Sequence, residues 1–300
     1  MKRNWMSGLV LLLAALPAAA EIRVAATTAN MGMLVETVGG EAVEVTVMAP
    51  NDRDPHYLEA RPSMMAALRN ADMVVAVGAE LEIGWLPAAI DGANNGTVQP
   101  GQSGYFELAR HIELIKDEGV ADRARGDVHP VGNPHAYMNP ENLAQAGRAL
   151  AERFASLDEG NAETFRANAE AFAAQVAEKM DAWRQAMGDP LPVLSYHGDV
   201  QYLAQALNVP LVGTIEPLPG VPPTASHLSD LVRDLKGREG VVLARVYQPD
   251  KPARFMAQQL GWTVHLLPSD VEPGAGADAY LELIGRWVAA MTRDDAASLD

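Results

Sequence analysis

The feature of this sequence that most restricts its fold is an alternation of strand and helix patterns that stops once and then resumes. The strand-like runs are residues 22–26, 43–48 and 73–77, and later 191–195, 211–215, 241–246 and 263–267. Helical patterns separate these runs, and such alternation is typical of mainly parallel sheets flanked by helices. A chain of 300 residues also exceeds the usual size of one hydrophobic core. We therefore predict an α/β fold with two lobes, each built on its own sheet.

The alternation of strands and helices stops at residues 161–187, and the pattern of these residues predicts one long helix. Large apolar side chains, among them Phe165, Phe172 and Trp183, recur there at helical spacings without an internal glycine or proline. A helix of this length spans about 40 Å, so we expect it to join the lobes rather than to lie on the surface of one domain. The predicted division is a signal peptide at 1–20, an N-terminal lobe at 21–158, a linking helix at 159–188 and a C-terminal lobe at 189–300.

The first twenty residues indicate export. Lys2 and Arg3 precede a short apolar core, and the small residues Ala18 to Ala20 follow it, as in a secretory signal peptide cleaved after Ala20. The apolar core is too short to span a membrane. Because the chain contains no cysteine, it offers no thiol for a disulfide or for a lipid anchor. We expect a free protein of the Gram-negative periplasm, not a lipoprotein.

The charge balance narrows the choice of ligand. With 23 basic and 39 acidic residues, the formal net charge is -16. A phosphate backbone would be repelled, so we exclude nucleic acid as a partner. A small cation suits such a chain, although most of these carboxylates are expected to be solvated.

Four residues in the two lobes form a candidate metal site. In open α/β sheets, ligands bind beyond the carboxyl ends of strands, and His56, His197 and Asp270 each follow a predicted strand. His135 lies in a loop stiffened by proline and glycine. Three imidazoles and one carboxylate make a tetrahedral set that suits Zn²⁺ without cysteine. Asp278 is the alternative carboxylate, but it falls at a helix start, where acidic residues have an ordinary capping role.

The remaining histidines have simpler interpretations. His265 falls within a predicted strand, His111 opens an apparent strand at 111–116, and His227 lies in the first turn of a helix. We predict that these three are packed or solvated rather than metal ligands. His129 lies in a polar loop and is either an exposed residue or an auxiliary metal contact.

The segments around the candidate ligands form recognisable motifs. They are Asp54-Pro55-His56 with Glu59, Gly132-Asn133-Pro134-His135 with Asn139-Pro140, Tyr196-His197-Gly198-Asp199 with Tyr202-Leu203, and residues 268–280. Over the whole mature chain, they resemble the metal-specific solute-binding proteins of ABC importers, the cluster A-I or cluster 9 family. This resemblance implies two lobes joined by a rigid helix, a metal in the interlobe cleft, delivery to an inner-membrane permease, and no catalysis.

The chain departs from the family pattern in two ways, one of which is a shorter spacing from Asp270 to Tyr280 that leaves Asp278 as a rival for the carboxylate. Zinc-type relatives often insert a histidine-rich loop before the second ligand, whereas residues 117–132 contain only His129. Manganese-type members usually place a carboxylate at the third position, where this chain has His197. Glu59 either orients His56 as a hydrogen-bond partner or is a solvated helix residue.

The sequence therefore predicts a monomeric, periplasmic zinc-binding protein that delivers Zn²⁺ to an ABC permease. A periplasmic metallochaperone is a further candidate partner. Manganese capture on the same scaffold is the first alternative. A zinc hydrolase is a second alternative, but the chain lacks a His-Glu-x-x-His motif, and a carboxylate in the fourth position would leave no site for water. A metal-binding adhesin or sensor is the third.

Overall fold

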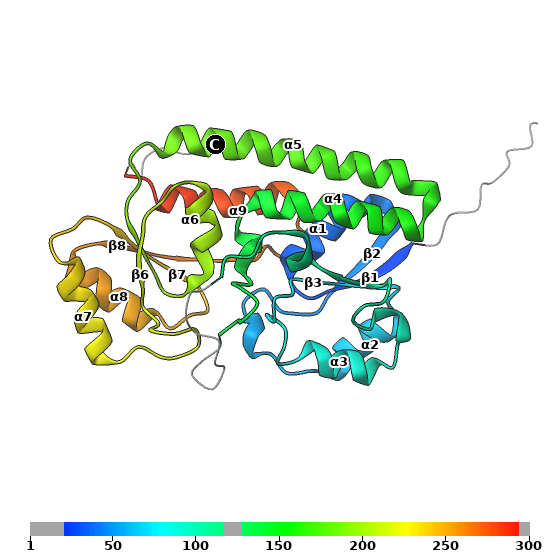
Figure 1. The fold of residues 1–300 in the computed structure, drawn as a ribbon, viewed down its shortest axis with the longest axis horizontal. Helices are drawn as coiled ribbons and strands as arrows, with labels where there is room; N and C mark the ends of the chain where they lie inside the picture. The colour runs from blue at the N-terminus through cyan, green and yellow to red at the C-terminus, as the bar shows by residue number, and fades with distance from the viewer. Residues whose placement is uncertain (1–20, 117–127, 294–300) are drawn as a thin grey trace, which may run out of the picture.

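Two parallel sheets, each with its own helices, form the two lobes of the molecule (Figure 1). The structure is a computed structural model and describes residues 21–116 and 128–293. The predicted signal peptide at 1–20 lies outside these described residues. The predicted α/β fold with two lobes is confirmed. Within the described part of the chain, no helix is long and apolar enough to cross a membrane.

The N-terminal lobe contains a four-stranded sheet in the order β2-β1-β3-β4. Its strands are β1 (Ile22–Ala26), β2 (Val43–Val47), β3 (Met73–Ala76) and β4 (Tyr105–Glu107). Its helices are α1 (Ala29–Gly39), α2 (Pro62–Asn70), α3 (Leu86–Ala93) and α4 (Pro140–Leu157). Strand β4, which has three residues, was not predicted from the sequence.

Both faces of this sheet are covered, which explains why β3 is apolar throughout and why β1 is apolar except at Arg23. Val24 and Val75 belong to the cluster beneath α1 and α4. Ala25 and Val74, which point to the opposite face, belong to the cluster beneath α2 and α3. The core therefore lies on either side of the sheet, and the strand ends point toward the other lobe.

The C-terminal lobe repeats the same strand order, β6-β5-β7-β8. Its strands are β5 (Val193–Ser195), β6 (Leu211–Thr214), β7 (Val241–Arg245) and β8 (Thr263–Leu267). Its helices are α6 (Gln201–Ala206), α7 (Ala225–Leu235), α8 (Asp250–Leu260) and α9 (Ala277–Ala290). All four predicted strands of this lobe are present within two residues of their expected bounds.

The strand expected at 111–116 was a wrong prediction. His111 ends a short 3₁₀ helix (Leu108–His111), and residues 112–116, the last ones described before residue 128, form no strand. The backbone of Ile115 is bonded outside any sheet: its N–H donates to the Tyr202 hydroxyl at 2.9 Å, and its carbonyl accepts from Asn133 at 2.8 Å. The backbone of this segment is therefore bonded to Tyr202 of the other lobe and to Asn133 of its own lobe, and not to a neighbouring strand.

The predicted linking helix is present as α5 (Ala162–Met187), which runs along both lobes (Figure 1). It packs against α1, α4 and α9. Its buried side chains include Phe165, Phe172 and Trp183, the residues whose spacing predicted it. One continuous hydrophobic cluster reaches from β1 across α5 to α9, so the two lobes share part of their core.

Asn30 in α1 connects the lobes by hydrogen bonds. Its side-chain amide donates to the Ser269 carbonyl at 2.8 Å, and its side-chain oxygen accepts from the Val271 N–H at 3.2 Å. Its backbone N–H donates to the Asp270 carboxylate at 3.3 Å. Because this asparagine is fully buried, it holds the end of β8 in a fixed position against the N-terminal lobe.

We predict that Asn30→Ala destabilises the protein by roughly 2–4 kcal/mol, because two buried backbone groups lose their hydrogen-bond partners. Urea unfolding of the mature protein measures this change. Asn168→Ala is the control, since Asn168 is only half-buried and donates one bond, to the Val38 carbonyl. Equal losses for the two variants would contradict a special role for Asn30 in joining the lobes.

Candidate metal centre

Three of the four predicted ligands meet between the lobes. One ring nitrogen from each of His56, His135 and His197 lies within 4.8 Å of the other two. The Nε2 atoms of His135 and His197 are 3.1 Å apart. Two of these histidines belong to the N-terminal lobe and the third to the C-terminal lobe, so the cluster bridges the two halves of the molecule.

His56 is positioned by a capped turn that follows β2. Asp54 caps a short 3₁₀ helix (Pro55–Tyr57): its carboxylate accepts from the His56 N–H at 3.0 Å and contacts Nδ1 at 2.7 Å. Burial favours the neutral form of Asp54, but its hydrogen bonds with His56 and the charge of Arg245 outweigh that effect and lower its pKa to about 2. Asp54 is therefore the partner of His56, whereas Glu59 is exposed.

His135 is fully buried at the start of another 3₁₀ helix (His135–Met138). The Asn133 side chain accepts from its backbone N–H at 2.9 Å. Its Nδ1 lies 3.2 Å from the Tyr137 hydroxyl and 3.1 Å from Nη2 of Arg245. Burial, together with the positive charge of Arg245, lowers the pKa of His135 well below its ordinary value.

His197 follows β5 directly, as the sequence predicted. Its Nδ1 lies 2.8 Å from the Glu216 carboxylate. Burial disfavours the charged imidazole, but the hydrogen bond to Glu216 and the nearby charges of Asp199 and Glu216 outweigh it and raise the pKa of His197. Sequence reasoning missed Glu216, although it follows the end of β6 just as the predicted ligands follow their strands.

Asp270 is not brought into the histidine cluster. Among the residues that the structure describes, the group able to hold a metal contains only the three histidines. The buried carboxylate of Asp270 accepts from the N–H of Asn30 and from the Ser269 hydroxyl, each at 3.3 Å. Its alternative, Asp278, is exposed in the first turn of α9, the position that suggested a capping role.

Arg245, the last residue of β7, is a second feature that sequence reasoning missed. Its guanidinium is buried and forms an ion pair with Asp199 at 2.8 Å. It also donates to the Tyr247 hydroxyl and lies over the rings of Tyr137 and Tyr247. Arg245 stands at the carboxyl end of a strand, where ligands bind in open α/β sheets. The sequence prediction considered only residue types that bind metals directly, and arginine is not one of them.

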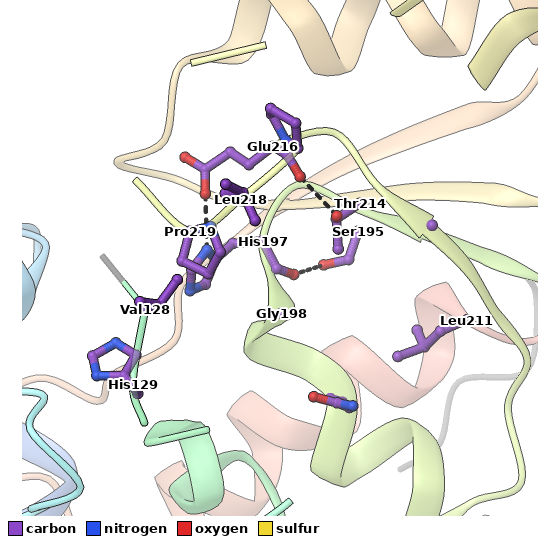
Figure 2. Close-up of a pocket in the computed structure, with 13 residues that line it drawn as sticks. Val128, His129, Ser195, His197, Gly198, Leu211, Thr214, Glu216, Leu218 and Pro219 are labelled. Carbon is purple, nitrogen blue, oxygen red and sulfur yellow. Dashed lines mark hydrogen bonds and ion pairs between the residues drawn. The ribbon is translucent and has the colours of Figure 1, made fainter. Parts of the chain in front are cut away.

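A cavity of about 370 Å³ opens beside His197 (Figure 2). His197, Glu216 and His129 line it together with apolar residues such as Val128 and Leu218. The His129 ring centroid is 5.2 Å from that of His56. His129 therefore lines the cavity and lies next to the candidate centre.

The other three histidines occupy ordinary structural positions. His111 stacks on Phe106 with ring centroids 4.6 Å apart, and His227 bonds the Thr214 carbonyl at 3.1 Å. His265 lies within β8. These positions agree with the packed or solvated roles expected for them.

Comparisons with known proteins extend over nearly the whole described chain. The family model for the periplasmic component A of the zinc-uptake complex matches residues 24–293. The iron ABC transporter substrate-binding lipoprotein MtsA of Streptococcus pyogenes serotype M1 is 25% identical over 224 residues, which cover 72% of this chain and 69% of MtsA.

Two solved structures show the same fold. The crystal structure of ZnuA has a TM-score of 0.73 at 21% identity and covers 91% of this chain and 100% of its own. The structure of FpvC from Pseudomonas aeruginosa in complex with Mn²⁺ has a TM-score of 0.73 at 20% identity, covering 90% of this chain and 96% of its own. With the family match, these likenesses show that the chain belongs to the ZnuA family of metal-binding substrate-binding proteins of ABC transporters.

Proposed function

We propose that this protein captures Zn²⁺ in the periplasm and delivers it to the permease of an ABC importer. The observation that carries the proposal is the convergence of three imidazoles from two lobes. A nitrogen-rich set suits Zn²⁺, whereas Mn²⁺ favours carboxylates, carbonyls and water. The family consists of transport proteins rather than enzymes, which agrees with a centre that holds its metal as cargo.

The neighbours of His56 and His197 support metal ligation. A metal-binding histidine usually donates the N–H of its second ring nitrogen to a carboxylate or carbonyl, which fixes the tautomer and the ring orientation. Asp54 and Glu216 offer such carboxylates to Nδ1 of the two rings. With its hydrogen on Nδ1, each ring carries a lone pair rather than a hydrogen at Nε2, which is the tautomer that metal ligation through Nε2 requires.

The fourth ligand stays a prediction. Asp270 was predicted to complete the shell, but in this structure its carboxylate contacts Asn30 and Ser269. The proposal therefore rests on the three histidines.

The location and partners of the protein are also proposed. The predicted signal peptide supports export, and the family supports an inner-membrane permease as the receiving partner. MtsA is named a lipoprotein, whereas this chain has no cysteine to carry a lipid. We propose a free periplasmic monomer, with a metallochaperone as a further candidate partner.

Single substitutions of the ligands test the site. We expect His56→Ala, His135→Ala and His197→Ala each to weaken Zn²⁺ binding roughly 100-fold or more, because an incomplete shell remains. Asp270→Asn should weaken binding less than any of these, since its carboxylate already bonds Asn30. Competitive titration against a zinc chelator measures the constants, and Glu59→Ala is the control. If two histidine variants bind as tightly as the wild type, the site is wrong.

Metal choice is the second test. We expect Zn²⁺ to displace Mn²⁺ at equal concentrations, because an N/O site binds Zn²⁺ more tightly in the Irving–Williams order. His197→Glu should reduce the difference between the Zn²⁺ and Mn²⁺ affinities, because it supplies a carboxylate, which Mn²⁺ favours. Metal analysis after equilibrium dialysis against both ions measures which ion occupies the protein. Mn²⁺ that remains bound against equimolar Zn²⁺ would assign the protein to manganese instead.

Zinc binding should also weaken in acid, because protons compete for His197. The pKa of this histidine is raised above 6.5, so the imidazole is protonated as the pH falls through that raised value. Glu216→Gln removes the carboxylate that favours the charged His197 ring. The pH at which half of the Zn²⁺ binding is lost should therefore be lower in this variant than in the wild type. Titrations between about pH 5 and 8 measure the midpoint. Glu170→Gln, on the surface of α5, should leave it unchanged.

A further inference from the structure

Arg245 places a hydrogen-bond donor against His135, where the other two histidines have acceptors. Its Nη2 lies 3.1 Å from Nδ1 of His135. A guanidinium can only donate hydrogen bonds, so Nδ1 of His135 must accept. By contrast, Nδ1 of His56 and of His197 each face a carboxylate, which can only accept.

This difference sets the position of the hydrogen on a neutral His135. A neutral imidazole with an acceptor at Nδ1 carries its hydrogen at Nε2. That atom is 3.1 Å from Nε2 of His197, which accepts because the hydrogen of His197 is on Nδ1, facing Glu216. A directed chain of hydrogen bonds therefore runs from Arg245 through His135 and His197 to Glu216. In this arrangement, the metal-facing nitrogen of His135 is occupied by a hydrogen.

We propose that Arg245 is a release residue, whose contact with Nδ1 of His135 competes with metal ligation at Nε2 of the same ring. The inference rests on the proposed zinc function. When the metal binds, Arg245 withdraws, the Nε2 hydrogen leaves as a proton, and Nδ1 takes up a proton from solvent. One proton is lost and one is gained, so the ring is neutral both before and after the exchange. Nδ1–H then donates to the Tyr137 hydroxyl oxygen, which lies 3.2 Å away.

The surroundings of Arg245 allow both states. Its ion pair with Asp199 and its bond to Tyr247 do not involve His135, so the guanidinium can leave Nδ1 while it remains paired. Asp199 is itself held by the Ser195 hydroxyl at 3.0 Å and by the Gln248 amide at 3.3 Å. These partners all belong to the C-terminal lobe, whereas His135 belongs to the N-terminal one. The return of Arg245 to Nδ1 thus links metal release to the relative position of the lobes.

The test removes the ion pair as a unit, so that no buried charge is left unpaired. In Arg245→Met/Asp199→Asn, we expect Zn²⁺ affinity to rise at least tenfold and transfer of Zn²⁺ to a chelator to slow by at least tenfold. The control is Arg254→Met/Asp250→Asn, an exposed ion pair on α8 with the same chemistry and a distance of 2.8 Å. Tyr137→Phe should act in the opposite direction and weaken binding, because Nδ1–H loses its acceptor.

The imidazole ¹⁵N spectrum provides a readout that does not depend on metal affinity. In the metal-free wild type, His135 should be the Nε2–H tautomer, and in the double variant it should become the Nδ1–H tautomer. An Nδ1–H tautomer in the metal-free wild type would overturn the inference, as would a folded double variant that binds Zn²⁺ no more tightly than the wild type. If the wild type itself binds no Zn²⁺, the proposed function fails, and the tautomer measurement still decides whether Arg245 sets the state of His135.

Discussion

The metal centre depends on two sheets being held with their carboxyl ends facing each other at a fixed separation. The Nε2 atoms of His135 and His197 approach to 3.1 Å, although they belong to different lobes. The shared core beneath α5 and the buried bonds of Asn30 hold that separation. Because a packed core resists small displacements, the three imidazoles are held close together.

The chemistry of the centre is set by the groups behind the ligands. Carboxylates of Asp54 and Glu216 contact Nδ1 of two of the rings, and Glu216 helps to raise the pKa of His197. The third ring, that of His135, is buried beside the guanidinium of Arg245, which disfavours a charged imidazole. In the mechanism that we propose, this difference separates metal binding from metal release, because only His135 must change its hydrogen-bond partner when a metal binds.

Family membership and site chemistry answer different questions. The ZnuA family match identifies the kind of protein, a substrate-binding component of an ABC transporter. The relatives differ in metal: MtsA is named for iron, and FpvC was solved with Mn²⁺. Identity near 20–25% shows the fold and not the cargo. The donor atoms must therefore support the choice of metal, and here they are imidazole nitrogens.

The amino-acid sequence was sufficient for the fold class, for α5 and for selecting the three histidines that the structure brings together, because each selection rests on local patterns. Strand and helix periodicity determines which side chains are buried, and Asn139 with Pro140 starts α4 through contacts within a few residues. Local patterns could not predict which side chains contact the candidate site residues. Arg245 contacts a histidine 110 positions away, and Asp270 bonds an asparagine 240 positions away. No local pattern encodes those pairs, since they form only when the packing of the two lobes brings the strand ends together.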